Sequence, residues 1–305
     1  DDDTVDYWSI SWQPVGKDLN MARYEIRHGL SYSVFSCDFQ GIRAQQTLFI
    51  PLNDPVELWD VVLENTGKNL RNLSVFSYCE FSFNHIDIDN QNFQMSLYCS
   101  GSSYHDGIIE IDQHYNPDGF HFFTSSVSPD GFDAVRDAFI GPYRTETNPL
   151  AVERGACSGS TELGGNHCGV LHKRLRLAGG TTARLIFLLG DGNRKTGVAL
   201  RQKYAEPAVV DGAFQALRSY WDTKCGAFQC KTPHQGMNTM LNVWNLYQAE
   251  TNVVWSRFAS FIEVGGRTGL GYRDTAQDAM CVPHSNPEKV RQRLTHDVAA
   301  ADDHD

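Results

Sequence analysis

The chain has 305 residues, of which 41% are hydrophobic, 11% aromatic and 21% charged, a composition that excludes fibrous, collagen-like and wholly disordered proteins. Acidic residues outnumber basic ones by 37 to 26, so the formal net charge of −11 argues against nucleic-acid binding as the main function. No apolar run approaches the ~18 residues of a membrane helix, so we expect neither a membrane span nor a membrane partner.

The two ends of the chain differ from those of a complete protein. The sequence begins with Asp1-Asp2-Asp3, its first methionine is Met21, and residues 295–305 show no apolar periodicity. No segment resembles a signal peptide. We therefore expect a piece of a longer protein.

Eight cysteines are spread along the chain without a Cys-x-x-Cys pair and without the density of a disulfide-stapled secreted module. The simplest interpretation is reduced thiols in a cytoplasmic protein. Cys225 and Cys230 lack a Cys/His partner pair at zinc-finger spacing, so we expect no metal site.

Residues 22–190 consist of short β-branched and aromatic segments separated by turn residues, a pattern typical of an antiparallel β-sandwich. Within them, the polar run Cys157–Gly165 predicts a flexible loop. The predicted strands are Tyr32–Phe39, Ile42–Pro51, Val56–Asn65, Leu73–Phe83, Phe93–Ser100, Gly107–Tyr115, Gly169–Leu177 and Thr181–Gly190.

After Gly192 the apolar residues recur with the period of helices. Two helices are predicted over Val198–Tyr204 and Val210–Trp221. A third is predicted from an apolar stripe whose methionine and tryptophan side chains we expect in the core: Met237, Met240, Leu241, Trp244 and Tyr247.

Ser285-Asn286-Pro287-Glu288 predicts a further helix start, with a capping residue, a proline in the first turn and an acidic residue near the positive end of the helix dipole. The domain order is therefore a β-sandwich over residues 1–192, a helical linker over 193–226, and the beginning of an all-helical domain over 227–305.

The densest polar cluster is the glycine-rich segment 263–278. Its glycines let the backbone approach a ligand closely, but they lack the context of a dinucleotide fingerprint and the lysine of a phosphate loop. Arginine suits a phosphate or carboxylate, while Asp274 and Asp278 offer acceptors for sugar hydroxyls. An ion pair of Arg273 with either aspartate, which would only fasten a loop to a helix, explains the same residues.

The sequence from Gly265 to Asp278, Gly-Gly-Arg-Thr-Gly-Leu-Gly-Tyr-Arg-Asp-Thr-Ala-Gln-Asp, followed by Val-Pro-His-Ser-Asn-Pro at 282–287, closely resembles the glycoside phosphorylases of glycoside hydrolase family 94. The resemblance reaches about Leu294 and includes three upstream segments: Asp6–Pro14, Arg27–Tyr32 and Asn166–Gly169.

Within this family, Thr275-Ala276 favours the branch that acts on a β-linked disaccharide of N-acetylglucosamine. The cellobiose and cellodextrin enzymes, which carry Phe-Arg-Asp-Ser-Asn-Gln-Asp at the positions of Tyr272 to Asp278, are the first alternative. A carbohydrate-binding β-sandwich without catalysis is the second.

The resemblance implies an N-terminal antiparallel β-sandwich that lacks its first strands, a helical linker and the start of a truncated (α/α)6 barrel. It also implies a reversible, inverting phosphorolysis of the disaccharide, with inorganic phosphate as a substrate and no cofactor or metal. A homodimer is expected for the full-length protein.

By the same resemblance, Arg267 is the phosphate-binding residue, and Arg273 and Asp274 bind the non-reducing sugar. The family's general acid lies in a later barrel segment, so Asp274 is not the proton donor and no catalytic residue is assigned in this chain. We therefore expect these 305 residues alone to be inactive.

Overall fold

The computed structural model describes residues 1–81, 99–114, 118–259 and 272–302, with the backbone alone for 254–259, 272, 274, 275 and 296–302. The chain forms two compact units, Asp1–Phe214 and Gln215–Asp305. Arg267 and most of the glycine-rich segment lie outside the described residues.

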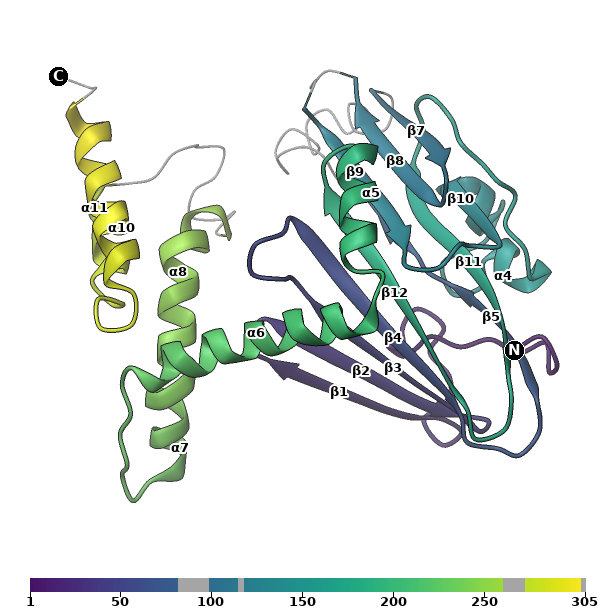
Figure 1. The fold of residues 1–305 in the computed structure, drawn as a ribbon, viewed down its shortest axis with the longest axis horizontal. Coiled ribbons are helices and arrows are strands. Elements are labelled where there is room, and N and C mark those ends of the chain that lie inside the picture. Colours follow the sequence, from purple (N-terminus) through teal and green to yellow (C-terminus); the bar gives the residue numbers. More distant parts are fainter. Residues whose placement is uncertain (82–98, 115–117, 260–271, 303–305) are drawn as a thin grey trace. The chain divides into compact units, whose positions relative to one another are not determined.

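The first unit is built on an eight-stranded antiparallel sheet in the order β1-β2-β3-β4-β12-β9-β8-β7 (Figure 1). Strands far apart in the sequence pair at the centre of this sheet: β12 follows β4 by more than a hundred residues and pairs with it from Thr182 to Gly190. Its strands are β1 (Arg23–Gly29), β2 (Tyr32–Phe39), β3 (Ile42–Phe49), β4 (Val56–Asn65), β7 (Ser100–His105), β8 (Ile108–Gln113), β9 (Phe120–Ser125) and β12 (Thr182–Asp191).

A second, smaller antiparallel sheet has the order β10-β11-β5, with the short β6 paired to β11. Two short helices, α3 and α4, follow β10 along the chain. The elements are β5 (Arg71–Phe76), β6 (Cys79–Glu80), β10 (Gly131–Val135), α3 (Arg136–Ile140), α4 (Leu150–Arg154) and β11 (His167–Leu177).

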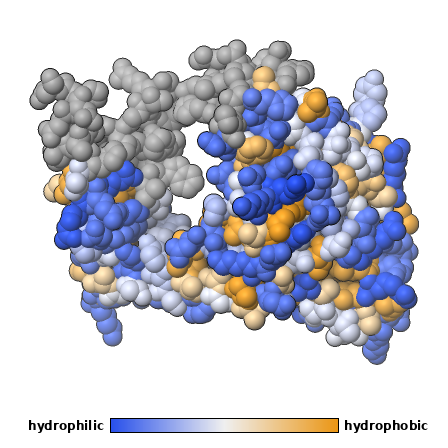
Figure 2. Space-filling view, turned by 45° about the horizontal axis from the view of Figure 1, so that its top comes forward, coloured by the Kyte–Doolittle hydropathy of each residue, from blue (hydrophilic) through white to orange (hydrophobic). Residues whose placement is uncertain are grey.

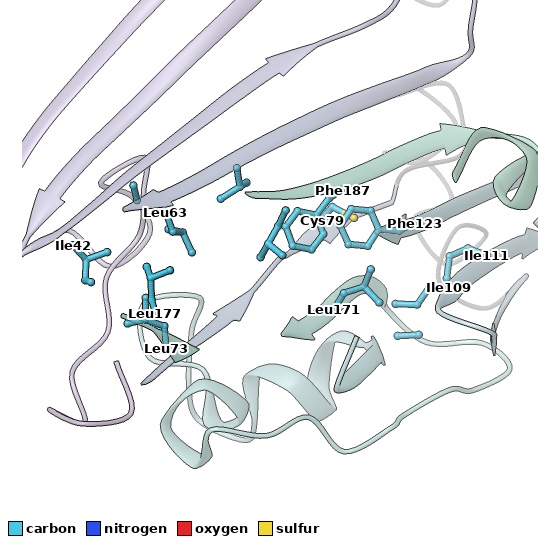
Figure 3. Close-up of a cluster of buried hydrophobic side chains, with 14 residues drawn as sticks. Ile42, Leu63, Leu73, Cys79, Ile109, Ile111, Phe123, Leu171, Leu177 and Phe187 are labelled. Atoms are coloured by element: carbon cyan, nitrogen blue, oxygen red, sulfur yellow. The ribbon is translucent and has the colours of Figure 1, made fainter. Parts of the chain in front are cut away.

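The core of this unit lies between the two sheets, which confirms the predicted antiparallel β-sandwich. Figure 3 shows side chains of both sheets pointing into the same space, among them Leu63 and Phe187 of the large sheet and Leu73 and Leu171 of the small one. Burial of such side chains is the main favourable contribution to folding. Buried and half-buried residues alternate over each half of β4, with a break at Trp59-Asp60, as expected from the pleat of a strand.

The predicted bounds of β2 and β4 match the structure. The described part of the predicted strand Leu73–Phe83 is instead divided into β5 and β6. Four strands were missed: β1, β7, β9 and β10, of which β7 shares only Ser100 with a predicted segment. In β1 the residues are exposed or half-buried on both faces, so no apolar alternation marks it, and pairing with β2 defines the strand. Residues 82–98, which held part of two predicted strands, lie outside the described residues.

The predicted flexible loop Cys157–Gly165 is instead anchored by a buried carboxylate. Asp133 of β10 accepts hydrogen bonds from Ser158 and Ser160 through both backbone N–H and hydroxyl groups, at distances of 2.5 to 3.1 Å. Farther along, Gly101 of β7 pairs with Leu163. The serines that give the loop its polar composition are thus the residues whose hydrogen bonds hold it in place.

Two helices occupy the stretch predicted as a linker: α5 (Arg194–Lys203) and α6 (Pro207–Gly226). Asn193 caps α5, since its side chain accepts hydrogen bonds from the N–H groups of Lys195 and Thr196. In the first unit, Phe214 of α6 packs edge-on against Tyr32 with ring centroids 5.0 Å apart, and Phe49 lies at 5.1 Å.

The second unit is helical, with Leu246 and Val253 buried. Its elements are the end of α6, α7 (Gln235–Thr239), a π-helical turn η1 (Met240–Trp244), α8 (Asn245–Ala259), α10 (Tyr272–Ala279) and α11 (Pro287–Asp302). The predicted third helix is thus interrupted by the wider turn η1.

The expectation that the two Met side chains and the Trp side chain of this helix are core is wrong for all three. Met237, Met240 and Trp244 are 50%, 51% and 39% exposed. On the face drawn in Figure 2, hydrophobic residues lie in small groups among hydrophilic ones.

Candidate functional site

Two of the three predicted ligand-binding residues lie in the first turn of α10. Arg273 and Asp274 are its second and third residues, and the Arg273 side chain is exposed. The side chain of Asp274 and the whole of Arg267 lie outside the described residues, so the ligand roles of all three stay predictions.

The structure corrects one expectation here, because Tyr272–Ala279 is a helix and not part of a glycine-rich loop. The segment contains neither glycine nor proline after Gly271, and an acidic residue in its first turn suits the positive end of the helix dipole. Arg273 and Asp274 are therefore neighbours on a helix, so their side chains leave the axis about 100° apart.

α10 ends in a compact turn that leads into α11. The N–H of Met280 donates to the carbonyl of Ala276, and the N–H of Cys281 donates to that of Asp278, both at 3.2 Å. Ala279 and Val282 are fully buried, and Pro283 cannot continue a helix of the preceding residues. Because this turn is buried, it fixes the position of the C-terminal end of α10.

A charged residue that the sequence analysis missed lies inside the second unit. Glu250 of α8 is 3% exposed, and its carboxylate lies 3.7 Å from the Lys224 ammonium group of α6. The sequence did hold a signal: Leu246, Glu250 and Val253 recur at i, i+4 and i+7, which places a carboxylate in an apolar stripe.

The two histidines of the first unit singled out by the family segments lie in different surroundings. His28 of β1 is exposed, and its Nδ1 lies 2.8 Å from the Ser33 hydroxyl. His167 of β11 is buried, and burial lowers the pKa of its imidazole. Neither histidine lies in the unit that carries α10.

A cavity of about 360 Å³ opens between the sheets of the first unit, with a mostly apolar lining that includes Trp8 and Trp59. Each indole also packs at a tilt on a phenylalanine ring: Trp8 on Phe39 with ring centroids 5.3 Å apart, and Trp59 on Phe123 at 5.2 Å.

Two general properties can be stated of the described residues. They contain no group of three or more His, Cys, Asp or Glu side chains placed to hold a metal ion. None of the helices described is both long and apolar enough to cross a lipid bilayer.

The chain matches two models of one protein family. Residues 1–207 match the model described as "Glycosyl hydrolase 94, supersandwich domain", and residues 220–303 match "Glycosyl hydrolase 94 superfamily, catalytic domain". The first match ends at the first residue of α6, and the second begins inside this helix. The sheets and helices described above agree with the two domain descriptions.

Comparison with curated proteins gives relatives over nearly the whole chain. It is 57% identical over 297 residues to N,N'-diacetylchitobiose phosphorylase of Vibrio proteolyticus, and 54% identical over the same length to the protein of that name from Vibrio furnissii. It is 30% identical over 306 residues to solabiose phosphorylase of Paenibacillus borealis. These alignments cover 96% to 97% of this chain and 37% to 38% of the relatives, so the chain spans little more than a third of their length.

Proposed function

Because the chain belongs to glycosyl hydrolase family 94, we propose that these residues are part of an enzyme that phosphorolyses N,N'-diacetylchitobiose to N-acetylglucosamine 1-phosphate and N-acetylglucosamine. The observation that supports this substrate is the 54% to 57% identity to two proteins named for it, against 30% to solabiose phosphorylase. Cellobiose and cellodextrin are the alternative substrates.

The proposed reaction needs one protein carboxyl group. Phosphate attacks the anomeric carbon of the non-reducing sugar from the face opposite the leaving group, and a carboxylic acid protonates the departing glycosidic oxygen. This is the scheme of an inverting glycosidase, in which phosphate replaces the water that a second carboxylate would activate. Inversion at a β-linkage gives the α-phosphate.

Three residues have roles in this proposal. Arg267 would pair with the incoming phosphate, whose oxygens suit the forked donors of a guanidinium group. Arg273 and Asp274, which α10 carries in adjacent positions, would bind the hydroxyl groups of the non-reducing sugar. Hydrogen bonds to those hydroxyls that shorten as the ring flattens would stabilise the transition state.

We further propose that the 305-residue chain alone is inactive, that no organic cofactor or metal takes part, and that the full-length enzyme is a homodimer. The general acid is assigned to a part of the enzyme outside this chain. Asp274 is kept as a binding residue, since an ionised carboxylate is a strong acceptor for sugar hydroxyls, whereas protonation of the leaving group needs a neutral acid.

The decisive experiment measures release of N-acetylglucosamine 1-phosphate from diacetylchitobiose and phosphate, with cellobiose alongside. It compares this chain with a version extended to the length of its curated relatives. Activity of the extended protein alone, on diacetylchitobiose, would support both the substrate and the missing acid. Activity of the 305-residue chain would make a carboxylate within it, Asp274 first, the proton donor.

The binding roles are tested in the extended protein by Asp274→Asn and Arg267→Lys. Loss of a charged hydrogen-bonding partner in a closed site costs about 2 to 4 kcal/mol, so kcat/KM should fall by about 30-fold or more in each. The KM for phosphate should rise in Arg267→Lys, and the KM for the disaccharide in Asp274→Asn. The reverse assignment of KM effects would exchange the two roles.

A further inference from the structure

Glu250 occupies a place where an ionised side chain is costly. It shares the buried face of α8 with Leu246 and Val253, and 3% of its surface is exposed. A carboxylate in such surroundings destabilises the fold unless hydrogen bonds and a counter-charge offset its desolvation. Its partners therefore indicate what it does for the protein.

Among the described residues, the hydrogen-bond donors to the Glu250 carboxylate lie at one dipeptide, and Lys224 and Lys289 face it as positive charges. The Ser285 hydroxyl donates to Oε1 at 3.0 Å, and Nδ2 of Asn286 donates to Oε2 at 3.1 Å. The Lys224 ammonium group, 3.7 Å from Oε1, donates to the carbonyl oxygen of Ser285 at 2.9 Å. Glu250 and Lys224 together hold Ser285-Asn286 from α8 and α6.

This dipeptide lies in the connection between α10 and α11. The N–H of Asn286 donates to the carbonyl of Val282 at 2.8 Å, and the carbonyl of Asn286 accepts the first helical bond of α11, from Val290, at 3.2 Å. Asn286 thus closes the turn at the end of α10 and starts α11. α10 packs on both α8 and α11.

α10 is a short helix, so the position of its C-terminal end determines the position of its first turn. It has eight residues, so Arg273 and Asp274 lie about 8 to 9 Å along the axis from Ala279 at its end. Because Ala279 and Val282 are fully buried, a shift of the turn would move the helix as one piece.

We propose that Glu250 is a positioning residue that sets the place of α10, and through it of Arg273 and Asp274, by holding Ser285-Asn286. The inference rests on the proposed function for the roles of Arg273 and Asp274. Glu250 is not itself the proton donor, since each of its carboxylate oxygens accepts a hydrogen bond and a lysine lies beside it.

The test uses a pair of substitutions that exchange donor and acceptor, made in the enzyme extended to the length of its relatives. Glu250→Gln removes the charge opposite Lys224 and leaves one acceptor oxygen where the carboxylate has two, so Ser285 and Asn286 no longer both donate to an oxygen of this side chain. Asn286→Asp restores an acceptor at that place and still caps α11, because aspartate is as good a cap as asparagine. Glu288→Gln is the matched control, since Glu288 is 63% exposed and forms an ion pair with the exposed Arg291.

We expect Glu250→Gln to raise the KM for diacetylchitobiose about tenfold and to lower kcat as well, because Arg273 and Asp274 bind the sugar in the ground state and more strongly in the transition state. The double variant Glu250→Gln/Asn286→Asp should return KM to within about threefold of the wild type, and Glu288→Gln should change KM less than about twofold. An unchanged KM in Glu250→Gln, or a fall in melting temperature with an unchanged KM, would overturn the positioning role.

A second measurement judges Glu250 without reference to any substrate. In the 305-residue chain, Glu250→Gln should speed amide hydrogen exchange in α10 about tenfold and leave α5 unchanged. Equal exchange of α10 in the two proteins would overturn the inference. Inactivity of the wild-type extended enzyme on diacetylchitobiose would instead reject the proposed function, and the exchange result would still decide the role of Glu250.

Discussion

Arg184 of β12 and Asp60 of β4 form a two-pronged ion pair, with Nε 2.7 Å from Oδ1 and Nη2 2.9 Å from Oδ2. The same guanidinium group donates to Asp211 of α6, with Nη2 2.7 Å from Oδ1. Arg184 and Asp60 are 23% and 16% exposed. One arginine therefore joins the two central strands of the large sheet to the start of α6.

Replacement of this arginine should destabilise the chain. Arg184→Met leaves the mostly buried Asp60 carboxylate without a counter-charge, so we expect the free energy of unfolding to fall by about 3 kcal/mol in urea titrations. Arg43→Met is the control, because Arg43 and Glu64 form a cross-strand pair that is 56% and 39% exposed. Its effect should stay below about 1 kcal/mol. Equal effects of the two changes would contradict this ranking.

The anchored loop after α4 gives a second prediction. Asp133→Asn replaces the fully buried carboxylate that accepts hydrogen bonds from Ser158 and Ser160, so one acceptor becomes a donor that faces donors. We expect a loss of about 2 kcal/mol and faster cleavage after Glu162 by a glutamate-specific protease. The exposed Asp137 supplies the control Asp137→Asn. Cleavage at the wild-type rate in Asp133→Asn would show that the loop is held in another way.

His172 predicts a loss of stability in mild acid. It is buried and stacked on Phe76 with ring centroids 4.2 Å apart, and its Nε2 lies 3.0 Å from the Ser74 hydroxyl. Burial, helped by the positive charges of Arg174 and Lys173 and opposed by Asp130 and Asp2, lowers the pKa of His172 below 6.5. As the pH falls below about 6.5, the unfolded chain takes up a proton that the folded chain does not, so stability decreases with falling pH.

The measurement is the melting temperature between pH 7.5 and 5, where His121 and His167, whose pKa values burial also lowers, act in the same direction. The N-terminal amino group, whose pKa burial also lowers, makes four such groups among the described residues, so His172→Gln should reduce the slope by about a quarter relative to the wild type. A steeper slope in His172→Gln would mean that the folded state binds this proton more tightly than the unfolded one.

The apolar stripe of α7 and η1 predicts self-association of the 305-residue chain. Met237, Met240 and Trp244 are each at least 39% exposed and lie within two turns of one another. Exposed apolar patches of this kind are commonly buried by contact with another molecule. Sedimentation velocity should give a mass that rises with concentration above the 34.2 kDa of the monomer.

Met240→Glu should weaken this association about tenfold, since a carboxylate in the contact must be desolvated. Gln235→Glu, a charge change at the exposed start of α7, is the control and should leave it unchanged. A monodisperse monomer at high concentration would contradict the prediction.

Local pattern was sufficient for much of the fold. The bounds of β2 and β4 follow from their β-branched and aromatic residues and from the turn residues that flank them. The start of α11 at Pro287 follows from the cap and proline before it, which act within a single turn. The family segments likewise led to the family that the two domain matches show.

The sequence could not supply what depends on distant residues. The strand β1 is defined by hydrogen bonds to β2 and not by its own polar sequence, and the loop after α4 is held by Asp133, twenty-five residues before Ser158. α10 was missed because its glycine-rich neighbours dominate the pattern, although its own eight residues favour a helix.

For the candidate site, the sequence by itself determined which residues resemble ligand-binding ones: Arg267, Arg273 and Asp274. Only the tertiary structure decided that Arg273 and Asp274 share the first turn of a helix, and that the base of this helix is tied to the buried Glu250. The physical reason is that the cost of burying a carboxylate is offset by donors thirty-five and thirty-six residues away, which no local pattern can reveal.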